Sequence, residues 1–149
     1  MSGRLEKIDF DVVFSSPLQR ARRTAELAGY PKPQLTSLLR EVDYGEYEGL
    51  TTKAIRESQP DWELYKDGSP GGETPAQIYA RAMEFINLAS AAGGRVLAFS
   101  HGHFLRAVAV AWIRLDVTAA STLDLDVATV SLLRDDERGR LLAIWNSPP

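Results

Sequence analysis

The chain has 149 residues, of which 44% are hydrophobic and 25% are charged, and its formal net charge is −3. This composition indicates one folded domain over residues 1–149 and argues against disorder, and the acidic balance argues against nucleic acid or an anionic membrane as a partner. The chain contains no cysteine, which excludes disulfides, thiol chemistry and cysteine-based zinc sites.

No window approaches the roughly 20 consecutive apolar residues of a membrane span. The first residues also lack the apolar core of a secretory signal. We therefore expect a cytoplasmic protein without a membrane partner.

Residues 9–14 (DFDVVF) predict a first strand, and Ser16 followed by Pro17 predicts a helix start. The serine hydroxyl can cap a free N–H group, and proline at the first helical position gives up a donor that has no partner there. Gly29 predicts the end of this helix. Arg20 is thus expected in its first turn, beside the carboxyl end of a strand.

Residues 34–39 predict a short strand, and a polar, glycine-punctuated loop over residues 40–49 follows it. Glu41 is the first acid of that loop, so it too is expected directly after a strand. Thr51 or Thr52 then predicts the cap of a helix that runs to about residue 58.

Thr74, followed by proline, predicts the start of a longer helix that ends at Gly93. Between these helices, Trp62 and Tyr65 indicate core or groove packing. A role of these rings or of Tyr44 in facing a substrate stays open.

Residues 96–99 read as a buried strand, and residues 104–113 are apolar at helical spacing. His101 is therefore expected where a strand meets a helix. In open α/β sheets ligands bind at this junction, and the helix start offers free N–H groups to an anion.

Residues 127–133 and 141–145 flank a polar turn and predict an antiparallel hairpin. The alternation of strands and helices before it predicts an α/β fold, a three-layer α/β/α sandwich with a mostly parallel sheet and this C-terminal hairpin.

Three expected strand ends thus carry Arg20, Glu41 and His101. A guanidinium binds phosphate oxygens in a fork, an imidazole adds a donor, and a carboxyl group can protonate a leaving alcohol. Each residue alone also has a structural explanation: a solvated charge, a surface ion pair, or a backbone hydrogen bond. His101 and His103 are two residues apart, a poor spacing for a metal site on a helix, so we expect no metal.

Four motifs carry a resemblance to a known family. They are residues 15–26 (SSPLQRARRTAE), 39–49 (LREVDYGEYEG), 71–74 (GGET) and 100–107 (SHGHFLRA). In this order they resemble the phosphoglycerate mutase-like branch of the histidine phosphatases, and within it the bacterial broad-specificity acid phosphatases.

The resemblance implies a role for each matching residue. Arg20, His101 and Gly102 would bind the phosphoryl group, and Glu41 would donate a proton to the leaving oxygen. Tyr44 and Glu73 would belong to the substrate pocket. The implied partner is a small-molecule phosphate monoester, with no metal or other cofactor and with a homodimer left open.

The chain also departs from the family pattern. Family members begin with a strand that ends in Arg-His-Gly, whose histidine is the nucleophile, and this sequence contains no Arg-His-Gly. Residues 1–9 correspond to the end of the family's first helix. We expect a phosphomonoesterase that is N-terminally truncated here and inactive or strongly impaired, with a non-catalytic phosphoester-binding module and a phosphoglycerate mutase as the alternatives.

Overall fold

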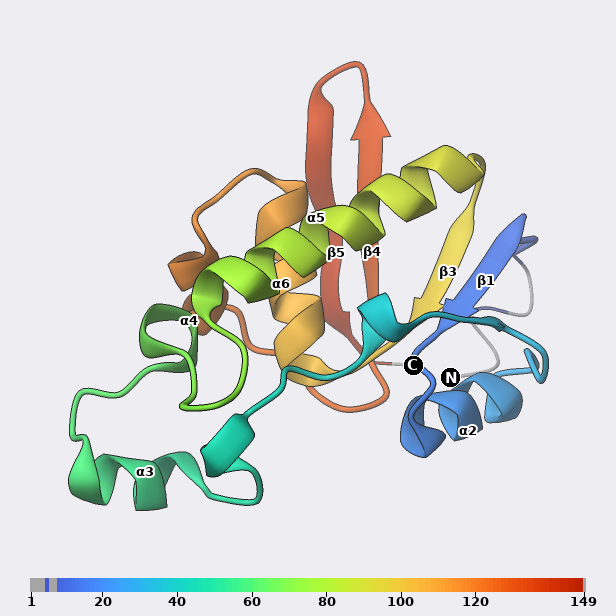
Figure 1. Cartoon of the computed structure of the whole chain (residues 1–149). Helices are drawn as coiled ribbons and strands as arrows, with labels where there is room; N and C mark the ends of the chain where they lie inside the picture. The colour runs from blue at the N-terminus through green and yellow to red at the C-terminus, as the bar shows by residue number, and fades with distance from the viewer. Residues whose placement is uncertain (1–4, 6–7, 149) are drawn as a thin grey trace.

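A computed structural model of the chain describes Leu5 and residues 8–148. Three strands, β1 (Val12–Ser15), β2 (Gln34–Leu35) and β3 (Val96–Phe99), form a parallel sheet in the order β2-β1-β3 (Figure 1). Two further strands, β4 (Val130–Asp136) and β5 (Gly139–Ser147), pair with each other as an antiparallel hairpin. The predicted mostly parallel sheet and C-terminal hairpin are confirmed, and within the described residues the hairpin makes no ladder with the parallel sheet.

Helices cover both faces of the parallel sheet. On one face α2 (Gln19–Leu27) packs Ala21 and Ala25 against Phe99, and on the other α5 (Pro75–Ala92) packs Phe85 edge-on against Phe14. The remaining elements are α3 (Thr52–Ser58), α4 (Leu64–Asp67), α6 (Gly102–Trp112) and the 3-10 turns η1 (Ser37–Leu39), η2 (Gly45–Tyr47) and η3 (Val117–Thr122). The predicted three-layer arrangement is therefore confirmed.

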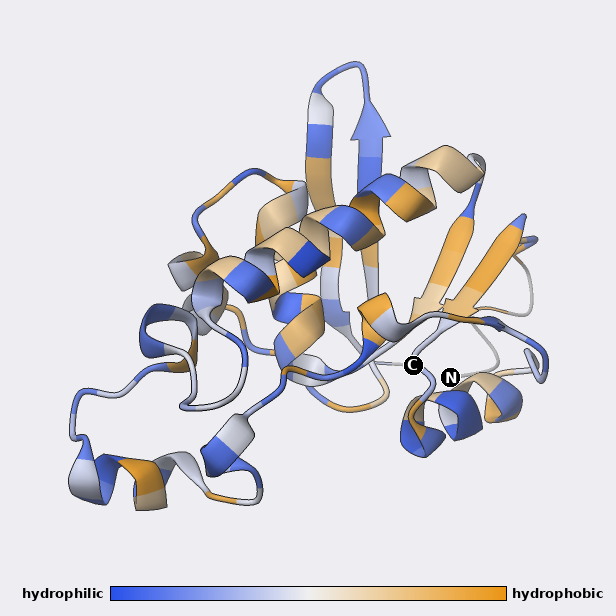
Figure 2. Ribbon diagram, in the orientation of Figure 1, coloured by the Kyte–Doolittle hydropathy of each residue, from blue (hydrophilic) through white to orange (hydrophobic). Residues whose placement is uncertain are grey.

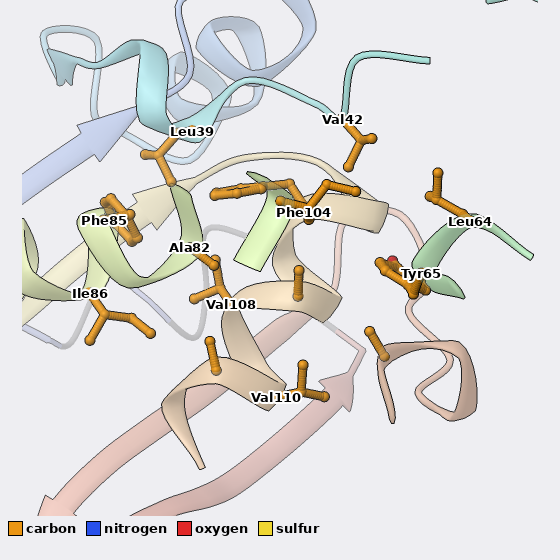
Figure 3. Packing of buried hydrophobic residues seen from close by; sticks show 14 of the residues in the cluster. Leu39, Val42, Leu64, Tyr65, Ala82, Phe85, Ile86, Phe104, Val108 and Val110 are labelled. Atoms are coloured by element: carbon orange, nitrogen blue, oxygen red, sulfur yellow. The ribbon is translucent and has the colours of Figure 1, made fainter. Parts of the chain in front are cut away.

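The core lies mainly between α5, α6 and the sheet. Figure 3 shows Ala82, Phe85 and Ile86 of α5 facing Phe104 and Val108 of α6. Figure 2 shows that β1 and β3 are hydrophobic along their length, as expected of strands covered on both faces, whereas the tip of the hairpin is hydrophilic. Among the described residues, no helix has both the length and the apolar character that crossing a membrane requires.

Local signals at the helix starts explain where several elements begin. Thr74 accepts a hydrogen bond from the N–H of Gln77, and the Gln77 side chain accepts one from the N–H of Thr74, which completes a capping box ahead of Pro75. Thr51 accepts a bond from Ala54 in the same way at the start of α3. The predicted helix starts at residues 51 and 74 are confirmed.

Two predicted boundaries that bear on the site are wrong; elsewhere, β1 begins at Val12 and not at residue 9, and β4 begins at Val130 and not at residue 127. Helix α2 begins at Gln19, because Ser16 accepts the Leu18 N–H and keeps Pro17 outside the helix. The predicted strand over residues 34–39 ends after two residues, because Thr36 caps a 3-10 turn. Glu41 consequently follows a 3-10 turn and not a strand. The predicted end of a first helix over residues 1–9 falls largely outside the described residues.

Candidate active site

Parallel pairing brings the ends of β1 and β3 to the same level. Ser15 lies opposite Phe99 in the register, and the Ser16 N–H donates to the Phe99 carbonyl at 2.9 Å. The next residues of both strands therefore emerge side by side at the carboxyl edge of the sheet, where α/β folds bind ligands.

Three side chains meet at this edge. The Arg20 Nε–H donates to His101 Nδ1 at 2.9 Å, and His101 Nε2 lies 2.8 Å from Ser16 Oγ. Ser16 and His101 are buried, while Arg20 is exposed in the first turn of α2. The structure thus brings together Arg20 and His101, which the sequence placed at two strand ends.

These contacts fix the protonation of His101. Arginine only donates, so Nδ1 accepts without a proton of its own and the neutral ring carries its proton on Nε2, toward Ser16. Burial, followed by the nearby Arg20 charge, lowers the pKa of His101 below its ordinary value of 6.5.

Glu41 lies at the amino end of α6. Its Oε1 accepts hydrogen bonds from the Phe104 and Val42 N–H groups, both at 3.0 Å. The Ser100 hydroxyl donates to the Leu39 carbonyl at 2.7 Å, which ties the segment before Glu41 to the end of β3. The carboxylate is therefore stabilised by a helix start one turn beyond His101.

The first N–H groups of α6 face the same region. His101 is the N-cap residue of this helix of 11 residues, and Gly102 is its first residue. No described hydrogen bond uses the N–H of Gly102 or of His103, so the helix start keeps two free donors beside His101. Free donors at a helix start are suited to an anion.

His103 makes hydrogen bonds with two tyrosines. The Tyr44 hydroxyl and His103 Nδ1 lie 2.5 Å apart, and the Tyr65 hydroxyl donates to the His103 carbonyl at 2.7 Å. Burial lowers the pKa of His103 and raises the pKa of Tyr44, the latter with a further contribution from the Glu41 charge. The Tyr44 ring is half-buried, and its hydroxyl is used in this contact.

Glu73 forms a two-pronged ion pair. Its Oε1 lies 2.7 Å from Arg81 Nε and its Oε2 lies 2.8 Å from Arg81 Nη2. Glu73 also lines a shallow hollow of about 430 Å³ whose walls include Gly72, Asp43 and Gln77. Arg20, Glu41 and His101 are not among the residues that line that hollow.

Two residues beside the site residues carry no site signal in the sequence. The sequence indicates Ser16 only as a helix cap, because a serine before a proline is its sole signal. Arg81 gave no signal, because it is one charged residue on a helix whose pattern reports only its apolar face. Among the residues that the structure describes, no group of three or more His, Asp or Glu side chains could hold a metal ion.

Comparison with known proteins identifies similar chains. A family model described as histidine phosphatase superfamily (branch 1) matches residues 1–148. An acid phosphatase from Mycobacterium tuberculosis is 42% identical over 144 residues, which cover 95% of this chain and 70% of that protein. A 2,3-bisphosphoglycerate-dependent phosphoglycerate mutase from Methylocella silvestris is 33% identical over 117 residues, which cover 68% of this chain and 57% of the mutase.

Solved structures show the same fold. The product of an open reading frame from Mycobacterium tuberculosis superposes with a TM-score of 0.88 and 41% identity, over 92% of this chain and 72% of that one. At this identity, the similarity extends to sequence as well as to backbone.

Proposed function

The chain belongs to branch 1 of the histidine phosphatase superfamily, and from this membership we propose that its pocket binds phosphate monoesters for hydrolysis of the acid phosphatase type, through a phosphohistidine. The observation that carries the proposal is the contact between Arg20 and His101 at the carboxyl edge of the sheet. The acid phosphatase relative supports the reaction type.

The phosphoryl group would be bound by Arg20, His101 and Gly102. Arg20 uses only its Nε in a described hydrogen bond, so its two terminal nitrogens remain available as a fork for phosphate oxygens. The free Gly102 N–H and the His101 imidazole would add donors from a second side. Stabilising the spread negative charge in this way is the main requirement of phosphoryl transfer.

Glu41 would supply the proton to the leaving oxygen. Its Oε1 is used by two N–H groups, whereas no described hydrogen bond uses Oε2. That oxygen is free to carry a proton toward a substrate. Tyr44 and Glu73 are proposed to border the substrate, although their polar atoms are already bonded to His103 and Arg81.

The phosphohistidine step needs a second histidine close to the phosphate. The sequence holds two histidines, and His103 is engaged with Tyr44. We therefore propose that the 149-residue chain binds phosphate monoesters with little or no turnover. A cytoplasmic location and the absence of nucleic-acid and membrane partners stay predictions.

Two measurements test this function. A generic aryl phosphate is assayed at mildly acidic pH with the 149-residue chain and with a version extended upstream by a strand that ends in Arg-His-Gly. We expect turnover by the extended version alone. Robust turnover by the 149-residue chain that survives replacement of His101 would contradict the proposal that the nucleophile is the histidine of the Arg-His-Gly strand.

Calorimetric titration with inorganic phosphate or orthovanadate tests binding separately. Binding without turnover in both versions would favour a non-catalytic binding module, and no binding by a folded sample would contradict the pocket. The mutase relative supports a second candidate. This candidate, a phosphoglycerate mutase, would transfer the phosphoryl group between two positions of a phosphoglycerate and would not release phosphate.

A further inference from the structure

Arg81 of α5 makes contacts on both sides of the Glu41 loop. Its Nη1 donates to the carbonyls of Leu38 and Arg40, each at 2.8 Å, and Arg40 directly precedes Glu41. The side chain is 17% exposed; its bond to Leu38 is partly buried, and its bond to Arg40 is exposed. Arg81 therefore fixes the backbone on the amino-terminal side of Glu41.

The other side of Glu41 is reached through Glu73. The carboxylate that pairs with Arg81 also accepts the Asp43 N–H at 2.9 Å, and the Glu73 N–H donates to the Asp43 carbonyl at 2.9 Å. Asp43 lies two residues after Glu41. The ion pair consequently holds the backbone on both sides of this carboxylate.

The same guanidinium also reaches the residue that binds Glu41. Its carbon lies 3.9 Å from the centroid of the Phe104 ring, and the Phe104 N–H donates to Glu41 Oε1. A cation over an aromatic face at this distance is attractive. Figure 3 shows Leu39 and Val42 pointing from the loop toward the core around Phe104, which places the loop directly over the start of α6.

From these contacts we propose that Arg81 is the positioning residue for Glu41: one guanidinium orders the Glu41 backbone on both sides and the ring of the residue whose N–H binds the carboxylate. Arg81 makes no described hydrogen bond to Arg20, Glu41 or His101, so it acts through other groups. The catalytic meaning of this placement rests on the proposed function, in which Glu41 donates the proton. The placement itself does not.

The Phe104 amide reports this placement in the 149-residue chain. In ¹⁵N-labelled protein, hydrogen exchange of Phe104 is compared with that of Val110, a buried residue of the same helix. A general loss of stability would speed exchange at both amides, so the ratio of the two rates reports the local change at Phe104. We expect Arg81→Met to speed Phe104 exchange relative to Val110 about tenfold or more, and Arg81→Lys to recover part of the protection, since lysine keeps the charge but not the fork.

Arg56→Met is the matched control. Arg56 also donates from Nε to a backbone carbonyl, that of Trp62 at 3.0 Å, but it lies on α3 away from Glu41. It should leave the Phe104 ratio unchanged. An unchanged ratio in Arg81→Met, or an equal change in Arg56→Met, would overturn the proposal. If Arg81→Met does not fold, Arg81→Lys alone decides, and an unchanged ratio in that variant would overturn it as well.

Vanadate titration of the unaltered chain keeps the two proposals distinguishable. Failure of vanadate to bind would contradict the proposed function. The Phe104 exchange ratio is measured without ligand, so its outcome judges Arg81 whatever the vanadate result.

Discussion

The Nε–H of Arg20 donates to Nδ1 of His101 across 81 positions of sequence, at 2.9 Å. This bond requires a neutral imidazole, because a protonated ring would present a second donor to the arginine. The residue proposed to hold the phosphate therefore also sets the tautomer of the histidine beside it. A phosphate entering the pocket would meet both groups already oriented.

The first prediction concerns the two histidines and pH. Burial lowers the pKa of both His101 and His103 below 6.5. As pH falls below about 6.5, the histidines of the unfolded chain become protonated before those of the folded chain. The free energy of unfolding should therefore decrease with falling pH in this window. Urea unfolding between pH 7.5 and 5.5 measures the decrease, above the range where carboxylates titrate.

NMR titration of the imidazoles checks the same prediction by residue. Two resonances are expected, each with a midpoint below 6.5. Arg20→Met should raise one midpoint, because the Arg20 charge lowers the pKa of His101, and the resonance that moves is thereby assigned. A midpoint at or above 6.5 for that resonance in the unaltered chain would contradict the described contacts.

The sequence was sufficient where the determining contacts are local. Thr74 and Pro75 start α5 through bonds that span three residues, and Gly29 ends α2 with a φ of +93°. Burial on both faces explains why the apolar runs of β1 and β3 could be recognised. These elements set the sheet order and hence the place of the site.

The sequence was insufficient where the determining contact is distant. Ser16 matches a helix cap, but its hydroxyl meets His101, 85 positions away. Glu41 follows a 3-10 turn, and its partner is the N–H of Phe104, 63 positions away. Neither contact can be predicted from hydrophobic periodicity, because the pattern indicates which face of an element is buried and not which polar groups form hydrogen bonds.

The second prediction concerns anion binding by Arg20. Arg20→Met removes the fork proposed for phosphate, and hydrogen bonds to charged groups contribute about 1.5–3 kcal/mol each. Affinity for orthovanadate, measured by calorimetry, should fall by at least roughly 10-fold to 100-fold, which is the effect of losing one such bond. The vanadate affinity of Arg20→Lys should lie between that of the unaltered chain and that of Arg20→Met, because lysine keeps the charge without the fork.

Arg23→Met is the control for that series. Arg23 lies on the same helix, pairs only with Glu26 among the described residues, and has a side chain that is 61% exposed. It should leave vanadate affinity unchanged. Equal losses in the Arg20 and Arg23 variants would show that the general charge of α2, and not a specific contact, attracts the anion.

The third prediction concerns the contact between two loops at Gly72. A Cβ atom added there would lie 2.3 Å from the Asp43 carbonyl oxygen and 2.6 Å from the Gly45 nitrogen, both of them backbone atoms. Gly72→Ala must therefore push the two loops apart, and we expect a loss of about 1–3 kcal/mol in the free energy of unfolding. Gly102→Ala is the control, because a Cβ there would have no neighbour within 4 Å. Equal stability of the two variants in urea would contradict the close approach.

The fourth prediction separates the structural role of Glu41 from its proposed chemical one. Glu41→Ala leaves the Phe104 N–H at the start of α6 without its acceptor, and the loss of such a cap costs about 0.5–2 kcal/mol. Glu41→Gln keeps an oxygen at that place and should cost about 0.3–1 kcal/mol, the usual contribution of a charge near a helix start.

Urea unfolding of both variants, with Glu48→Ala as an exposed control in the same loop, measures the difference. If Glu41→Gln is as stable as expected, its effect on turnover in a version that carries a nucleophilic histidine can be assigned to the missing proton. If Glu41→Gln lowers the free energy of unfolding as much as Glu41→Ala does, the carboxylate charge itself stabilises the start of α6. A loss of turnover in Glu41→Gln could then not be assigned to proton transfer.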